Sequence, residues 1–101
     1  MDPDVAVDVL DKKYVIPILL NLRDNPGIGK SELFRNLKDS NNKTIYTRLN
    51  DLRAAGLIYV DTERRKHNTA LLYLTPQGQK VAALLREAVD VVKELEIKTE
   101  S

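Results

Sequence analysis

The chain of 101 residues carries 16 Lys plus Arg against 15 Asp plus Glu, a net charge of +1, with one His and no Cys. This length allows one small domain, and the lack of cysteine excludes disulfides and thiol chemistry. A lone histidine provides no pair for a transition metal, so no metal or other cofactor is expected. No apolar run approaches the roughly 18 residues of a membrane helix and no leader-like segment is evident, so we expect a cytoplasmic domain without a membrane partner.

The first predicted helix begins after Asp11, a good N-cap, and ends before the turn signal Asn25-Pro26-Gly27. Apolar side chains nearly encircle this helix, which places it at the centre of the core. Pro17 lies inside it and is expected to remove one helical hydrogen bond and to kink the axis. Residues 1–11 form an extension whose apolar side chains are a further candidate for a subunit interface.

Two more helices are predicted over residues 30–38 and 41–55, the second with Asn41 as N-cap and Gly56 as C-cap. The helix 41–55 buries one apolar face, at i, i+4 and i+7: Ile45, Leu49 and Leu52. Its other face carries amides, hydroxyls, an aromatic ring and a cation, groups that hydrogen-bond to base edges: Asn42, Lys43, Thr44, Tyr46, Thr47 and Asn50. For this helix taken alone, a solvated face of mixed composition remains the alternative.

Two apolar runs at residues 57–62 and 70–75 flank a polar stretch and predict an antiparallel hairpin. Its tip, a basic wing over residues 61–70, holds three successive cations that favour contact with phosphate: Arg64, Arg65 and Lys66. The neighbouring His67 is expected to be an ordinary loop residue. Further phosphate contacts are expected at the start of the second helix and on the flanks of the third: Lys30, Ser31, Arg48 and Arg53.

Positive charge is concentrated in the middle of the chain, because residues 30–75 contain nine Lys and Arg against five Asp and Glu. Such asymmetry suits a surface that binds a polyanion, although many segments of this charge are simply solvated.

The last predicted helix begins at Pro76, continues to about Ile97 and leaves residues 98–101 as a disordered tail. Apolar residues recur along it at spacings of 3 and 4 and form a stripe that is too broad for one small domain to bury. One face of the stripe closes the core of the same chain, and the exposed remainder marks a surface for a second copy. The predicted dimer residues are Val81, Leu84, Leu85, Ala88, Val91, Val92 and Leu95.

Two short sequence blocks are typical of a known family of proteins. Residues 54–58, "AAGLI", end the third helix, and residues 73–78, "YLTPQG", close the hairpin. Over residues 12–80 the sequence resembles the HxlR-like transcription regulators of bacteria and archaea, with MarR-like and PadR-like proteins as relatives. It departs from them at Tyr14, where the family usually has Trp, and at Pro17, which replaces an aliphatic residue. The cysteine typical of many HxlR-like proteins is absent, so thiol-based sensing is not implied.

The resemblance implies a mostly α-helical winged helix–turn–helix with a small β-hairpin wing, over residues 1–75, followed by a dimerisation helix over 76–97. It further implies a homodimer that binds double-stranded DNA specifically and regulates transcription, with repression favoured over activation. The recognition helix 41–55 would then enter the major groove and the wing would follow the backbone or the minor groove. The sequence identifies no small-molecule effector.

Two alternatives remain open: a winged-helix module that binds protein, and an architectural protein that binds DNA without specificity. An apolar patch on the outer face of the third helix would favour the first. Enzymatic activity is not expected, because no carboxylate pair lies in an apolar stretch and the four glycines form no phosphate-binding motif.

Overall fold

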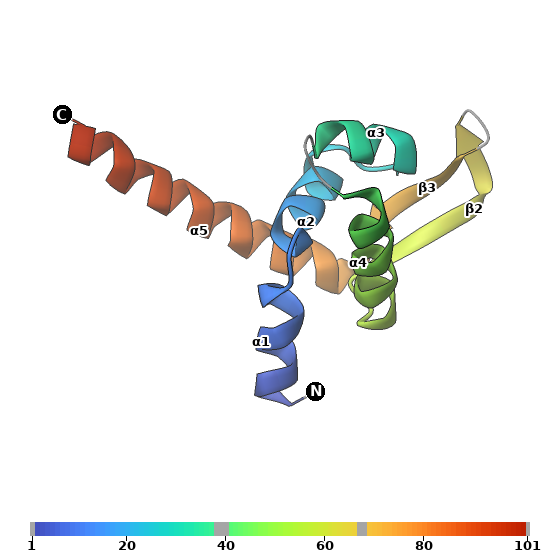
Figure 1. Cartoon of the computed structure of the whole chain (residues 1–101), viewed down its shortest axis with the longest axis horizontal. Coiled ribbons are helices and arrows are strands. Elements are labelled where there is room, and N and C mark those ends of the chain that lie inside the picture. Colours follow the sequence, from blue (N-terminus) through green and yellow to red (C-terminus); the bar gives the residue numbers. More distant parts are fainter. Residues whose placement is uncertain (1, 38–40, 67–68, 101) are drawn as a thin grey trace.

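The computed structural model describes residues 2–37, 41–66 and 69–100, which form a mostly helical fold with a small antiparallel sheet (Figure 1). The order is α1 (Pro3–Asp11), α2 (Val15–Asp24), β1 (Ile28–Gly29), α3 (Lys30–Asn36), α4 (Asn42–Ala54), β2 (Ile58–Lys66), β3 (Thr69–Leu74) and α5 (Pro76–Glu100). The predicted winged-helix architecture is confirmed. Within the described residues, no helix is both long enough and apolar enough to cross a membrane.

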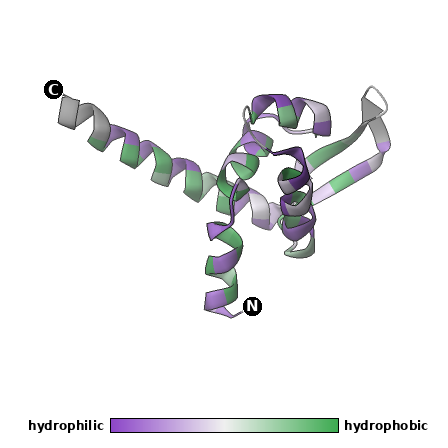
Figure 2. Cartoon of the chain, viewed as in Figure 1, coloured by the Kyte–Doolittle hydropathy of each residue, from purple (hydrophilic) through white to green (hydrophobic). Residues whose placement is uncertain are grey.

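Helix α2 lies at the centre of the core, as its apolar composition predicts. The buried side chains come from α2, α3, α4, the sheet, the residues that follow α3 and α4, and one residue of α5. The largest fully buried ones include Ile18, Leu19, Leu22, Leu33, Ile45, Leu52, Ile58 and Leu72. One cluster of this kind is what a chain of 101 residues can build. Figure 2 shows that hydrophobic residues also continue along α5, beyond the part that packs on this core.

The start of α2 differs from the prediction. Asp11 is the last residue of a separate helix α1, which Asp2 caps by accepting a hydrogen bond from the Asp4 N–H at 2.9 Å, so Asp11 is not an N-cap. The chain then turns through Tyr14, whose φ of 72° is left-handed. Pro17 therefore stands in the first turn of α2, where an N–H has no intrahelical partner. The prediction that Pro17 removes a hydrogen bond from the helix is therefore wrong. The kink that was expected to follow from that loss has no reason to form.

The sheet has the order β1-β3-β2. The predicted hairpin is present, and its strands extend further than expected, with the pairs Arg65↔Ala70 and Lys66↔Thr69 beyond a register shift that begins after Asp61. The third strand, β1, was not predicted and pairs Ile28 with Leu72. A strand of two residues has no periodicity of its own, so only its partner β3 defines it.

The two sequence blocks that carry the family resemblance lie against each other. Gly56, with φ of 78°, ends α4, and the following Leu57 N–H donates to the Leu52 carbonyl at 3.0 Å, the pattern of a Schellman motif. The Thr75 hydroxyl donates to the Gly56 carbonyl at 2.7 Å and accepts from the Gly78 N–H at 3.0 Å. A Cβ at Gly78 would lie 1.9 Å from the Leu57 oxygen, so no other residue fits there. The blocks thus fix α4, the wing and α5 relative to one another.

Helix α5 packs on the core through its first half and projects away from it through its second half (Figure 1). Ala82 is fully buried, and Arg86 forms an ion pair of 2.5 Å with Asp24 at the end of α2. The helix continues to Glu100, three residues beyond the predicted end at Ile97, because no glycine or proline follows to stop it.

Candidate nucleic-acid interface

Helix α4 begins at a well-defined cap. As predicted, Asn41 is the N-cap, and its side-chain oxygen accepts hydrogen bonds from the N–H groups of Lys43 at 2.9 Å and Thr44 at 3.3 Å. The predicted inward residues are buried: Ile45, Leu49 and Leu52. Cap and buried face together fix which side chains point away from the core.

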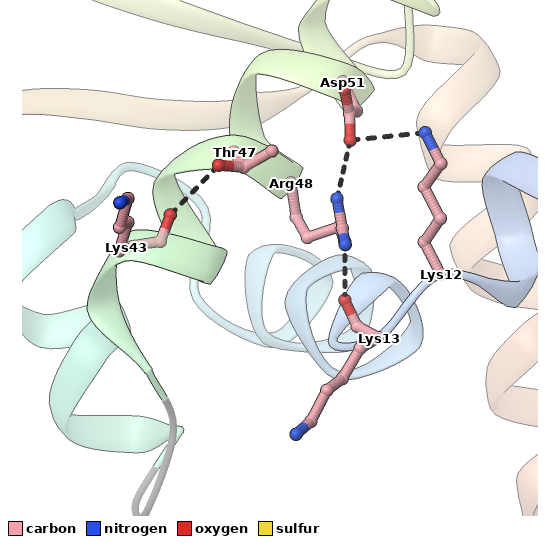
Figure 3. A network of polar contacts seen from close by, with 6 residues as sticks. All are labelled: Lys12, Lys13, Lys43, Thr47, Arg48 and Asp51. Atoms are coloured by element: carbon pink, nitrogen blue, oxygen red, sulfur yellow. Dashed lines mark hydrogen bonds and ion pairs between the residues drawn. The ribbon is translucent and has the colours of Figure 1, made fainter.

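The six residues predicted to reach base edges lie together on the opposite side of α4, which we call its outer face. Thr44 is half-buried, and the other five are exposed: Asn42, Lys43, Tyr46, Thr47 and Asn50. The Thr47 hydroxyl donates to the Lys43 carbonyl at 3.1 Å (Figure 3), so its oxygen remains available as an acceptor. The face combines donors, acceptors and one cation within less than three helical turns.

Tyr46 contacts two residues of α3, Lys30 and Phe34, and no role in the interface was predicted for Phe34. The Tyr46 ring packs edge to face on Phe34 of α3, with 5.1 Å between the ring centroids. The Lys30 Nζ lies 5.1 Å from the Tyr46 centroid, a cation–π contact. Phe34 has no signal in the sequence that distinguishes it from a core residue. Through this contact the first residue of α3 joins the outer face of α4, beside the exposed Ser31.

Arg48 differs from the other predicted phosphate contacts because its guanidinium is engaged inside the chain. Its Nη1 lies 2.9 Å from Asp51 Oδ2, and its Nε donates to the Lys13 carbonyl at 3.1 Å (Figure 3). Asp51 Oδ2 also pairs with Lys12 Nζ at 3.4 Å. Arg53 is exposed and forms no ion pair within the described part of the chain.

The backbone of the wing is described as part of β2 and β3, and the side chains of the three predicted wing cations are not: Arg64, Arg65 and Lys66. His67 lies outside the described residues. The phosphate contact of the wing therefore stays a prediction.

The predicted dimer residues of α5 fall into two groups. Val81 and Leu85 are half-buried against the core of their own chain. The others are exposed and lie within about 100° of the helix circumference; we call them the exposed stripe: Leu84, Ala88, Val91, Val92 and Leu95. Leu84, the most exposed of them, shows 66% of its surface to solvent. Two valines of α1, Val5 and Val7, are also exposed.

An apolar groove of about 290 Å³ lies between α1, the end of α4 and the start of α5, lined by Ala6, Val9, Leu10, Ala55, Leu57, Gln77 and Val81. Among the described residues, no three His, Cys, Asp or Glu side chains converge as they would to hold a metal ion.

No protein-family model and no curated protein matches the sequence. Solved structures do share the fold. The chain is similar to a possible HxlR family transcriptional factor from Thermoplasma volcanium GSS1, with a TM-score of 0.80 and 20% identity over 95% of this chain and 86% of that one. A putative MarR-family regulator from Porphyromonas gingivalis W83 matches with a TM-score of 0.77 and 21% identity, over 93% of this chain and 95% of that one.

F-93 of SSV1 has 25% identity and a TM-score of 0.65, over 79% of this chain and 89% of that one. The resemblance to HxlR-like and MarR-like regulators is thus confirmed at the level of the fold, and the two structures from these families are described as a transcriptional factor and a transcriptional regulator.

Proposed function

We propose that the chain binds double-stranded DNA specifically, as a homodimer, and thereby regulates transcription. The observation that carries the proposal is the outer face of α4, where amides, hydroxyls, an ammonium group and a phenol stand on one helix and five of the six side chains are exposed. These groups match the donors and acceptors of base edges in the major groove, which is wide enough to admit an α-helix. The regulators that share the fold support the same assignment.

In the proposed complex the N-terminal half of α4 leads into the groove. Lys43 donates to O6 or N7 of guanine, and Asn42 or Asn50 pairs with N6 and N7 of adenine. The methyl group of Thr44 or Thr47 contacts a thymine methyl. Since every one of these residues lies within the same three turns of helix, one docking geometry serves all of them.

Contacts to the DNA backbone orient this helix and add affinity without specificity. We assign these contacts to side chains of α3, α4 and the wing: Lys30, Ser31, Arg53, Arg64, Arg65 and Lys66. The Tyr46 ring limits the positions open to the Lys30 ammonium, which therefore loses less conformational freedom when it binds a phosphate.

The exposed stripe of α5 supplies the dimer contact. Its side chains remain in water in the single chain, and a second copy of the same helix removes them from it. A two-fold dimer places two α4 helices in successive major grooves, about 34 Å apart, so the site is pseudo-palindromic. Repression is the favoured mode, because occupation of a duplex site is enough to exclude other proteins from it.

A protein-binding module is less consistent with this surface, because Tyr46 is the one large hydrophobic side chain exposed on the described part of α4. An architectural role would use the same backbone contacts and differs only in lacking base specificity.

Selection of bound sequences from a random duplex pool separates these functions. We expect enrichment of a pseudo-palindrome with half-sites one helical turn apart. Binding to all sequences without enrichment would indicate an architectural protein, and no binding in dilute buffer would favour the protein-binding module.

A further inference from the structure

The segment between α1 and α2, residues 12–14, runs along the recognition helix and contacts it three times; we call it the brace. Lys12 Nζ pairs with Asp51 Oδ2 at 3.4 Å, and the Lys13 carbonyl accepts from Arg48 Nε at 3.1 Å (Figure 3). The Tyr14 hydroxyl accepts from the Asn41 N–H at 3.4 Å. Three consecutive residues thus hold α4 from its N-cap to its third turn.

Two local features create this arrangement. Tyr14 adopts a left-handed conformation with φ of 72°, which is unfavourable for a non-glycine residue and persists where surrounding contacts hold it. Lys13 precedes Tyr14, the N-cap of α2, so the Lys13 carbonyl takes no part in the hydrogen bonds of the helix, and Pro17, four positions later, has no N–H to offer it. The Arg48 guanidinium binds this carbonyl.

The charge of Arg48 is already compensated within the chain. Its side chain is only 21% exposed, and Asp51 holds it at 2.9 Å. Arg53, five residues further along the same helix, is exposed and has no ion pair in the described part of the structure. The two arginines therefore have different chemistry available to them: Arg53 can neutralise a phosphate, whereas Arg48 would first have to leave Asp51 and Lys13.

We propose that Arg48 is a positioning residue, which fixes the orientation of α4 on the brace and does not contact DNA. This inference rests on the proposed function, since it concerns the accuracy with which the outer face of α4 meets base edges. Base recognition through paired hydrogen bonds tolerates errors of only about 0.5 Å, whereas contacts to phosphate tolerate more. Loss of the brace is thus expected to lower specific binding and to spare non-specific binding.

The variant Arg48→Lys separates positioning from phosphate contact. Lysine keeps the charge and can replace arginine at a phosphate, but its single ammonium cannot span the Lys13 carbonyl and the Asp51 carboxylate as the planar fork does. We expect affinity for the selected duplex to fall about tenfold or more, with affinity for a random duplex unchanged. If the ratio of the affinities for the selected and the random duplex stays as in the wild type, the proposal is overturned.

Two variants calibrate this measurement. Arg53→Gln should weaken binding to both duplexes by a similar factor. It should also lower the salt slope, the steepness with which the logarithm of the binding constant falls with the logarithm of salt concentration, by about one, as a lost phosphate contact does. Arg48→Gln should lower the ratio of the affinity for the selected duplex to the affinity for the random duplex. The salt slope on the random duplex should stay as in the wild type. A slope lowered by about one in Arg48→Gln would assign Arg48 to phosphate and overturn the proposal. Arg23→Lys on α2 is the neutral control.

Hydrogen exchange of the free protein tests the brace without DNA, and so separates this proposal from the proposed function. In Arg48→Lys the amides of α4 are expected to exchange faster, and those of α2 at the wild-type rate. Tyr14→Phe, which removes only the hydroxyl, should accelerate the Asn41 amide and serves if Arg48→Lys folds poorly. Unchanged exchange of α4 in both variants would overturn the positioning role. A wild-type chain that prefers no duplex sequence would overturn the proposed function, and the exchange result would still decide the role of Arg48.

Discussion

The outer face of α4 and the exposed stripe of α5 are both helical surfaces in contact with water, and they differ in composition. The first presents amides, hydroxyls and an ammonium group, which water solvates well. The second presents Leu84, Val91, Val92 and Leu95, each with more than half of its surface exposed. Apolar area left in water carries a free-energy cost that a covering protein surface removes, whereas polar groups gain only from a partner with matching donors and acceptors.

Under the proposed function, this difference gives the two regions different partners, DNA for the outer face of α4 and a second copy of the chain for the exposed stripe. A surface that binds DNA is exposed to water whenever DNA is absent, so its side chains must be well solvated. A dimer surface is exposed only when the two chains dissociate, so its side chains can be apolar. The contacts among Gly56, Leu57, Thr75 and Gly78 join the two regions rigidly, so the position of one sets the position of the other.

The largest expected effect of a substitution is on dimerisation, at the exposed stripe of α5. Leu84→Asp would place an unpaired carboxylate in the dimer contact, so the dimer dissociation constant should rise by about 100-fold or more. Sedimentation equilibrium measures it. Asp90→Asn, on the opposite side of α5, also changes the charge by one unit and should leave the dimer intact. A wild-type dissociation constant in Leu84→Asp would remove the stripe from the interface.

At the wing, replacement of Arg64, Arg65 and Lys66 by Ala should weaken binding and lower the salt slope by up to about three, since each lost phosphate contact removes about one. Titration of a labelled duplex at several salt concentrations gives the slope. Dimerisation should not change. A salt slope equal to that of the wild type would show that the wing does not contact phosphates.

On the outer face of α4, Asn50→Ala or Thr47→Ala should cost about 1–3 kcal/mol on the selected duplex and alter preference at one base position, if that residue reads a base. Competition between the selected and random duplexes measures the cost. Equal losses on the two duplexes would argue against base reading by the residue in question.

The smallest effect concerns the connection between the two regions. Gly56→Ala should lower the free energy of unfolding by about 1 kcal/mol, because φ is 78° and no atom lies near enough to clash with the added methyl group. Thermal unfolding measures it, and Gly56→Asn should lose less, since Asn tolerates this conformation. Sequence preference and dimerisation should be unchanged. Equal stability of wild type and both variants would contradict the strain assigned to Gly56.

Local patterns were enough to predict the parts of the molecule that local forces determine. The cap at Asn41, the buried face of α4 and the left-handed end at Gly56 follow from residue type and spacing, and all three are present. The exposed stripe of α5 follows in the same way, from apolar spacing that exceeds what a small core can cover.

Features that depend on tertiary contacts were missed. The break between α1 and α2 lies at residues 12–14, which bond to α4, and β1 is defined by its pairing with β3. Arg48 has the spacing of a flanking cation, and its inward position depends on a carbonyl 35 residues away. The absence of an N–H at Pro17 is the one signal that could have indicated an open acceptor there.

The mass of the complex between the protein and its selected duplex, measured by native mass spectrometry at low ionic strength, tests most directly whether these two surfaces have the partners assigned to them. Two chains on one duplex, with the complex lost in Leu84→Asp, is the expected result. Single chains that leave every duplex unbound would contradict both assignments at once.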